Sequence, residues 1–581
     1  MNTFRFLFPY IKSHWPGYAC GLLVAPFSVA AGLAVPYLTG EAVAVLQSPH
    51  QEGPELSTLL YWILAASIVG GVTLFAVRYL IIGASRKVEF DLRNHLFQHL
   101  QSLDQPYFKS ARTGDIMARA TADVDSCRTI VGPVILYSAR TLILLAAAIP
   151  LMLSVSWVLT ACILLPLSLL TAAVRLIGPR VHAAVLKSQE ALSELSSTAQ
   201  ENFSGVRVVK SFAREKNEIS RFTDVSRRYL KRNVKVARTQ AWMHPIIGGV
   251  DSISFMALLF VGGFLMLYHN LELRDFIKFT GYLAYLLWPM VSIGWVVNQF
   301  HRGSASVERL RAIFKVQPRI TEHARPLVPT SGTIEGHISI RNLTFSYGQQ
   351  RILTSLSLEV PHGQTIAIIG RTGAGKSTLI SLIPRIYPVP DDTIFIDGID
   401  VNRLPLEMLR RSIGFVPQES FLFSRTVSEN IAFGVEETDP DDIYGVAEIT
   451  RLGKDIDQLP RGYDEVVGER GVTLSGGQKQ RAAMSRALLV KPKILILDDA
   501  LSAIDTQTEE EILANLKRAT KDLTTIVVAH RISSIQHADH IYVLETGKIV
   551  EDGSHDELLR SKGIYAEIYQ MQLISDELDH L

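Results

Sequence analysis

A glycine-rich octapeptide in the second half of the chain has the composition of a phosphate-binding loop. It follows the β-rich run 364–370, reads Gly-x-x-x-x-Gly-Lys-Ser, and precedes an apolar helical segment. Glycines let backbone N–H groups wrap around phosphate oxygens, the lysine supplies charge for the β and γ phosphates, and the serine hydroxyl suits Mg²⁺. The loop and the threonine after it predict a site for ATP and Mg²⁺: Gly370, Arg371, Thr372, Gly373, Ala374, Gly375, Lys376, Ser377 and Thr378.

Two adjacent carboxylates end a second apolar run, Ile494 to Leu497, and give the phosphate site a partner. Ligands of open α/β sheets bind outside the carboxyl ends of the strands, so Asp498 is predicted to hold Mg²⁺ together with Ser377. Short β-rich runs alternate with helical segments from about residue 337 onward. This alternation predicts an α/β domain with a mostly parallel sheet.

The motif Leu-Ser-Gly-Gly-Gln at 474–478 separates this chain from other proteins with a phosphate loop, because here the sequence resembles the ABC ATPase family. The resemblance implies that Tyr347 stacks on adenine and that Ser502 to Asp505 form the D-loop. It also implies that Gln418 and His530 join Asp499 in catalysis, with Gln418 as a further Mg²⁺ ligand.

The same resemblance implies that the chain works as a dimer. In that family the signature motif of one chain completes the ATP site on the phosphate loop of the other chain. Backbone N–H groups at a helix N-terminus suit the γ-phosphate. A lone chain would hold two half-sites, and the residues offered to the partner's ATP are Ser475, Gly476, Gly477 and Gln478.

The first half of the chain has the hydropathy of a membrane domain. Six apolar segments are long enough to cross a bilayer: 17–38, 59–83, 133–155, 157–177, 246–269 and 276–298. Residues 303–336 are polar and contain prolines, as a linker does. We therefore expect a multi-domain membrane protein. Its parts are an all-α six-helix transmembrane domain at 1–302, a linker at 303–336, and an α/β P-loop ABC ATPase domain at 337–581.

The distribution of lysine and arginine predicts the orientation in the membrane. The segment 39–58 has neither residue type, whereas 84–132 and 178–245 are basic, so these two long loops and both termini are expected in the cytoplasm. Helical spacing of apolar residues in the loops predicts that the membrane helices continue into the cytoplasm. The start of the chain, Met1 to Ser13, has the pattern of an amphipathic interfacial helix rather than a signal peptide.

The membrane half resembles the exporter branch of the same family, and the whole chain is similar to MdlA-like multidrug half-transporters. Residues 113–125 and 201–212 match the two coupling loops, and Glu465 to Gly471 matches the loop that senses them. The resemblance implies a multi-pass protein of the bacterial plasma (inner) membrane with its ATPase domain in the cytoplasm. The net charge of +1 argues against a nucleic-acid partner.

One residue departs from the family pattern. Asp499 stands where the family has a glutamate that polarises the attacking water, and its carboxylate is one methylene shorter. We therefore expect a poorly hydrolysing ATP site, and a heterodimer with a homologous half-transporter that carries the glutamate. Two alternatives stay open: a homodimeric lipid or drug exporter in which Asp499 is the base, and a non-transporting ATP-regulated sensor.

The sequence says little about the transported compound, which could be a small hydrophobic molecule, a lipid or a peptide. Arg78, Arg140 and Asp251 are ionisable residues within predicted spans. They either snorkel to the interface or pair between helices, or they line a polar entrance to the cavity. The aromatic residues considered for its wall are Trp288, Phe255 and Tyr282. The three cysteines, Cys20, Cys127 and Cys162, are expected to be free thiols.

Overall fold

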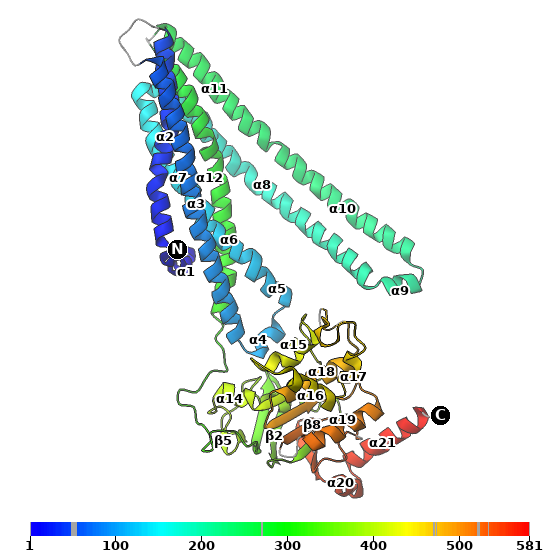
Figure 1. Cartoon of the computed structure of the whole chain (residues 1–581). Helices are drawn as coiled ribbons and strands as arrows, with labels where there is room; N and C mark the ends of the chain where they lie inside the picture. The colour runs from blue at the N-terminus through cyan, green and yellow to red at the C-terminus, as the bar shows by residue number, and fades with distance from the viewer. Residues whose placement is uncertain are drawn as a thin grey trace. The chain divides into compact units, whose positions relative to one another are not determined.

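The computed structural model describes residues 2–47, 55–268, 271–468, 471, 473–519, 523–532 and 534–579 (Figure 1). The chain divides into two compact units. The helical unit comprises Met1–Ser102 and Ala111–Val316, and the α/β unit comprises Leu103–Ser110 and Gln317–Leu581. The α/β unit is thus built from two separate stretches of the chain.

Long helices make up the helical unit, and in Figure 1 α8 and α10 run side by side and are joined at their ends by α9. The unit begins with α1 (Asn2–Ser13), as expected for the N-terminal segment. The other elements are α2 (Trp15–Gln47), α3 (Leu56–Ser102), α5 (Thr113–Ala118), η1 (Arg119–Asp123), α6 (Val124–Thr129), η2 (Ile130–Val134), α7 (Ile135–Val155), α8 (Trp157–Ser204), α9 (Val206–Ser211), α10 (Glu215–Ala241), α11 (Met243–Tyr268) and α12 (Leu273–Phe314).

Five helical stretches among the described residues are long and apolar enough to cross a membrane. They are Trp15–Gln47, Leu56–Ser102, Thr113–Val155, Gly248–Tyr268 and Leu273–Phe314. A shorter apolar segment, Trp157–Pro166, begins α8. The expected span 157–177 lies there, and its side chains at 167 and 169–176 are outside the described residues. At the other end of the unit, α12 runs to Phe314, into the stretch 303–336 that was expected as linker.

The core of the helical unit includes Tyr282, which was considered as a residue of the cavity wall. Tyr282 is 2% exposed and packs in a cluster with Phe279 and Leu286, so the prediction that it lines a cavity is wrong for this structure. Its neighbour Gly281 explains the tight packing, because an added β-carbon there would overlap Pro36 of α2. Large exposed side chains remain at Trp288 and Phe255. The three cysteines are free, as expected.

Buried charges in the helical unit are paired, both within one helix and between helices. Glu89 of α3 accepts hydrogen bonds from Arg86 and Arg93, and Asp123 of η1 pairs with Arg309 of α12. Unpaired buried ions are costly, so such pairs are expected. Arg78 and Arg140 make no ion pair or hydrogen bond with any described side chain. The side chain of Asp251 lies outside the described residues.

Two sheets organise the α/β unit. A small antiparallel sheet has the strand order β2-β1-β4-β5, and the main sheet has the order β10-β9-β3-β8-β7-β6. Strands β9, β3, β8, β7 and β6 are parallel, and β10 joins the edge in antiparallel register, which confirms the predicted fold class. The strands are β1 (Ile338–Tyr347), β2 (Gln350–Val360), β3 (Thr365–Ile369), β4 (Ile394–Ile396), β5 (Ile399–Asp400), β6 (Ile413–Val416), β7 (Ile494–Asp498), β8 (Thr524–Val528), β9 (His540–Glu545) and β10 (Lys548–Gly553).

Helices cover both faces of the main sheet and give the unit two apolar cores, one shared with the small sheet and one packed under the helices at 476–489, 506–519 and 564–579. The helices are α4 (Gln105–Ser110), α13 (Lys376–Leu382), α14 (Leu406–Arg411), α15 (Val427–Ile431), η3 (Ala432–Gly434), α16 (Pro440–Ile449), α17 (Gly453–Ile456), η4 (Gly462–Asp464), α18 (Gly476–Leu489), α19 (Thr506–Ala519), α20 (His555–Ser561) and α21 (Ile564–Asp579).

The two expected coupling loops differ in how well their positions were predicted. The short helix α9 lies within the expected range 201–212. The first loop instead turns through α4 at 105–110, before the expected range 113–125, which forms α5, η1 and the start of α6. The segment 113–125 is continuously helical, and the chain instead turns at residues 103–104, between the end of α3 at Ser102 and the start of α4 at Gln105.

Candidate nucleotide site

The loop between β3 and α13 has the backbone shape that a phosphate cradle needs. Gly373 and Gly375 have φ angles of +85° and +105°, which favour glycine. At Gly370 an added β-carbon would overlap the carbonyl oxygen of Leu544, so the close approach of β9 also requires glycine there. At three of the predicted positions the backbone conformation or the close packing therefore requires glycine, which a sequence pattern alone does not explain.

Lys376 lies inside this loop as a buried cation with only neutral partners. Its side chain donates hydrogen bonds to the carbonyl oxygens of Gly370 at 2.7 Å and Arg371 at 3.3 Å, and the residue is 6% exposed. Burial lowers the pKa of its ammonium group, and the nearby Asp498 and Asp499 carboxylates oppose that shift. A buried ammonium without a close carboxylate fits an anionic polyphosphate.

Ser377 and Asp498 meet as the metal hypothesis requires. The Ser377 hydroxyl donates to Asp498 Oδ1 at 3.1 Å, and Asp498 is the buried last residue of β7. Burial raises the pKa of Asp498, and the Ser377 hydrogen bond opposes the shift. A hydroxyl and a carboxylate are oxygen ligands of the kind Mg²⁺ takes. Gln418, the third expected ligand, follows the neighbouring strand β6 and is exposed.

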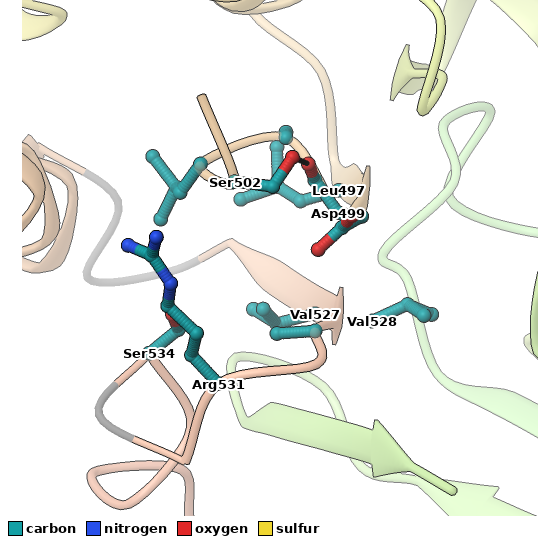
Figure 2. A pocket seen from close by; sticks show the side chains of 10 residues that line it. Leu497, Asp499, Ser502, Val527, Val528, Arg531 and Ser534 are labelled. Carbon is teal, nitrogen blue, oxygen red and sulfur yellow. Dashed lines mark hydrogen bonds between the residues drawn. The ribbon is translucent and has the colours of Figure 1, made fainter. Parts of the chain in front are cut away.

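Asp499 has an unusual backbone conformation at the end of β7. Its φ angle is +49°, a left-handed value that aspartate adopts more readily than most residues. Its N–H donates to the carbonyl oxygen of Val528 at 2.7 Å, and its own carbonyl accepts from the Ser502 hydroxyl at 2.9 Å. Figure 2 shows Asp499 and Ser502 on one side of a small pocket, with Arg531 and Ser534 on the other.

The segment that carries His530 is held from two sides by residues that the sequence analysis missed. Gln572 of α21 donates to the His530 carbonyl at 2.5 Å and accepts from the Ile532 N–H at 2.9 Å. On the other side the buried Glu509 carboxylate of α19 accepts from Arg531 and Ser534. His530 is close enough to Asp498 to lower the pKa of that carboxyl group by electrostatic attraction. The partners lie 22 to 42 residues away in sequence, so no local pattern marks them.

The motif at 474–478 forms the start of a helix. Ser475 caps α18 in a reciprocal arrangement with Gln478, whose side chain also donates to Asp455 at 3.1 Å. A β-carbon at Gly477 would lie 2.8 Å from the Ala503 carbonyl oxygen. Gln480, another residue that the sequence analysis missed, accepts from the Ala503 N–H and donates to Ser502. The start of α18, which carries the motif, is thus held against the segment 502–505 by these hydrogen bonds and by close packing at Gly477.

Tyr347, the predicted adenine partner, ends β1 beside the phosphate loop. Its hydroxyl donates to Thr378 Oγ1 at 3.4 Å, and its ring packs edge-on against Phe345 and Tyr387. The Nζ atom of Lys109, from α4, lies 4.7 Å from the ring centroid. Of the segment Glu465 to Gly471, residues 469 and 470 lie outside the described residues, and Glu465 and Val467 pair with the backbone near Thr426.

Together the fold and the site define a nucleotide-dependent membrane protein: a P-loop domain with a parallel sheet on the same chain as a set of bilayer-length helices. Comparison with known proteins gives the family. The family models described as "ABC transporter transmembrane region" and "ABC transporter" match residues 18–290 and 353–502.

Relatives match the chain over nearly its full length. It is 34% identical over 586 residues to the multidrug resistance-like ATP-binding protein MdlA of Escherichia coli, covering 100% of this chain and 98% of that protein. It is 33% identical over 568 residues to the probable multidrug resistance ABC transporter YheI of Bacillus subtilis, covering 97% and 96%. A bacterial Atm1-family ABC exporter solved with ATP bound has a TM-score of 0.79 at 27% identity, covering 97% and 99%.

The chain therefore belongs to the ABC transporter family, as a half-transporter of the exporter type. It is an integral, multi-pass membrane protein with an ATPase domain on its cytoplasmic side, and the family couples ATP hydrolysis to export.

Proposed function

We propose that this chain is the hydrolytically impaired half of a heterodimeric exporter for hydrophobic or amphipathic compounds in the plasma (inner) membrane. Its own phosphate loop binds ATP and Mg²⁺, and the ATP bound there is hydrolysed slowly. Its residues Ser475 to Gln478 complete the competent site on a homologous partner chain. The multidrug names of two full-length relatives support this class of cargo.

Asp499 is the observation that carries the proposal. A general base contributes about 10²- to 10⁴-fold in rate when it is correctly placed. The aspartate side chain is one methylene shorter than glutamate, so its carboxylate falls short of the water by about 1 Å, an error that can cost about 10²-fold. Its backbone is also fixed, because Val528 and Ser502 bond its N–H and carbonyl groups. The chain therefore has little freedom to shift and compensate.

The other residues of the site suit the binding of ATP and Mg²⁺. Lys376 would hold the β and γ phosphates, and Ser377, Asp498 and Gln418 would hold Mg²⁺, which supplies charge stabilisation when bound. His530 lies within electrostatic range of Asp498 and is positioned by Gln572. Tyr347 would stack on adenine. A site built in this way stores ATP and keeps the dimer closed while the partner site hydrolyses.

Substitutions at Asp499 test the proposal in both directions. In the reconstituted heterodimer Asp499→Asn changes turnover little, whereas glutamine in place of the partner's catalytic glutamate nearly stops it. Asp499→Glu raises hydrolysis at this chain's site by about 10-fold or more, because the longer side chain reaches the water. ATPase activity is measured with each chain alone and with both together.

A homodimer would give a different result. If the purified chain alone hydrolyses ATP rapidly and loses that activity on Asp499→Asn, Asp499 is the base and no second chain is needed. ATP-dependent uptake of a fluorescent amphipathic compound into inside-out vesicles then decides between a transporter and a non-transporting sensor, since a sensor shows none.

A further inference from the structure

The helix α4 belongs to the α/β unit although it follows directly after α3 in the chain. Asp104, just before the helix, accepts hydrogen bonds from the backbone N–H groups of Arg319 at 2.6 Å and Ile320 at 3.2 Å. These bonds fix the start of α4 on the α/β unit. The other end of the helix is thereby brought to Tyr347.

The Tyr347 ring has two aromatic neighbours packed edge-on and one cation over its face. Phe345 and Tyr387 pack against it with ring centroids 5.1 Å away in each case, and both are buried in the core. The Lys109 ammonium lies 4.7 Å from the ring centroid, over the ring face, and Lys109 is itself exposed. An ammonium over an aromatic face is attracted by the negative face of the ring.

We propose that Lys109 and a nucleotide base compete for the same face of Tyr347. This inference rests on the proposed function in one respect, that Tyr347 stacks on the base. Lys109 then lowers the affinity of the site for ATP, and by reciprocity a bound base releases Lys109 from the ring by the same factor. Base binding is in this way linked to α4, the segment that leads back to the helical unit.

The size of the effect follows from the exposure of the contact. An exposed cation–π contact is weak, so its loss changes affinity by about two- to fivefold. Lys109→Met keeps the length of the side chain and removes the charge. We expect it to tighten ATP binding to the purified full-length chain by that factor. Lys109→Arg, which keeps a cation over the ring, leaves the affinity near that of the parent.

Two further measurements separate the possible outcomes. Inorganic tripolyphosphate has no base, so Lys109→Met leaves its affinity unchanged if competition at the ring is the cause. In a Tyr347→Ala background Lys109→Met has no effect on ATP. Weaker or unchanged ATP binding by Lys109→Met in the parent background overturns the competition. If Tyr347→Ala alone leaves ATP affinity unchanged, the adenine site of the proposed function fails instead.

Discussion

Among the residues that the structure describes, two lysines are almost completely buried, one in each unit, and their surroundings differ. Lys278 of α12 is 5% exposed, and its ammonium lies 2.7 Å from a Glu41 oxygen and 3.4 Å from an Asp275 oxygen. It also lies 4.5 Å from the ring centroid of Tyr37. Lys376 is 6% exposed and has only two backbone carbonyls within hydrogen-bonding distance.

The difference separates a structural charge from a binding charge. Lys278 has its counter-ions within the chain, and its stem fills the space beside Gly40, so it joins the end of α2 to the start of α12. Lys376 lacks a carboxylate at contact distance, although Asp498 and Asp499 are near enough to influence its pKa. Since an uncompensated buried charge is costly, Lys376 is stabilised most by an anion that comes from outside.

The largest expected effect is at Lys376. Lys376→Met removes the charge but keeps the apolar stem, and we expect ATP affinity to fall at least about 100-fold, since a hydrogen bond to a charged group contributes up to about 3 kcal/mol. Equilibrium binding of ATP to the purified protein measures it. Lys491→Met, at an exposed lysine paired with Asp442, is the matched control. Unchanged affinity in Lys376→Met would mean that the loop does not bind phosphate.

The second effect is on stability and concerns Lys278. Glu41→Leu leaves the buried ammonium with Asp275 alone, and we expect a loss of about 2–3 kcal/mol of stability in the helical unit. Thermal unfolding of the protein in detergent measures the change. Adding Lys278→Met to Glu41→Leu recovers most of it, because an apolar pair of similar volume can replace a buried ion pair. If the double variant is no more stable than the single one, Lys278 contributes something other than this pairing.

The smallest effect is at Tyr347 and separates the base from the phosphates. Tyr347→Ala removes the stacking surface, which contributes about 1 kcal/mol, or roughly fivefold in affinity, to nucleotide binding. Binding of tripolyphosphate stays unchanged, because its contacts are with Lys376 and the loop. Competition between a fluorescent nucleotide and each ligand measures both. A loss for tripolyphosphate as well would show that Tyr347 shapes the loop itself.

The strands and the phosphate loop could be predicted because their signals are local. Apolar runs ending in glycine or aspartate mark β3 and β7, and the parallel order of the sheet then brings Ser377 to Asp498. Contacts between distant residues could not be predicted in this way. Gln572 beside His530, Lys109 over Tyr347 and Glu509 under Arg531 join segments with no shared pattern.

Two predictions in the helical half failed for a related reason. Tyr282 is an aromatic residue in a predicted span, of the kind that can line a cavity. Its burial follows from the close packing of α2 on α12, which the sequence does not show. The first coupling loop was expected at 113–125 from the resemblance to the family. The helix continues there, and the chain turns at α4 instead. Hydropathy locates the helices, whereas the choice of turn depends on what the turn packs against.

The assignment of α4 to the α/β unit has a consequence for how this chain could be divided. A fragment that begins at Gln317 lacks Leu103 to Ser110 and so leaves the N–H groups of Arg319 and Ile320 without the Asp104 carboxylate. Tyr347 loses its cation in the same fragment. The boundary between the membrane half and the ATPase half of the sequence is therefore not a suitable place to cut the chain, either to express the ATPase domain alone or to exchange it between homologues. A graft of the soluble domain would need to carry a matching α4 with it.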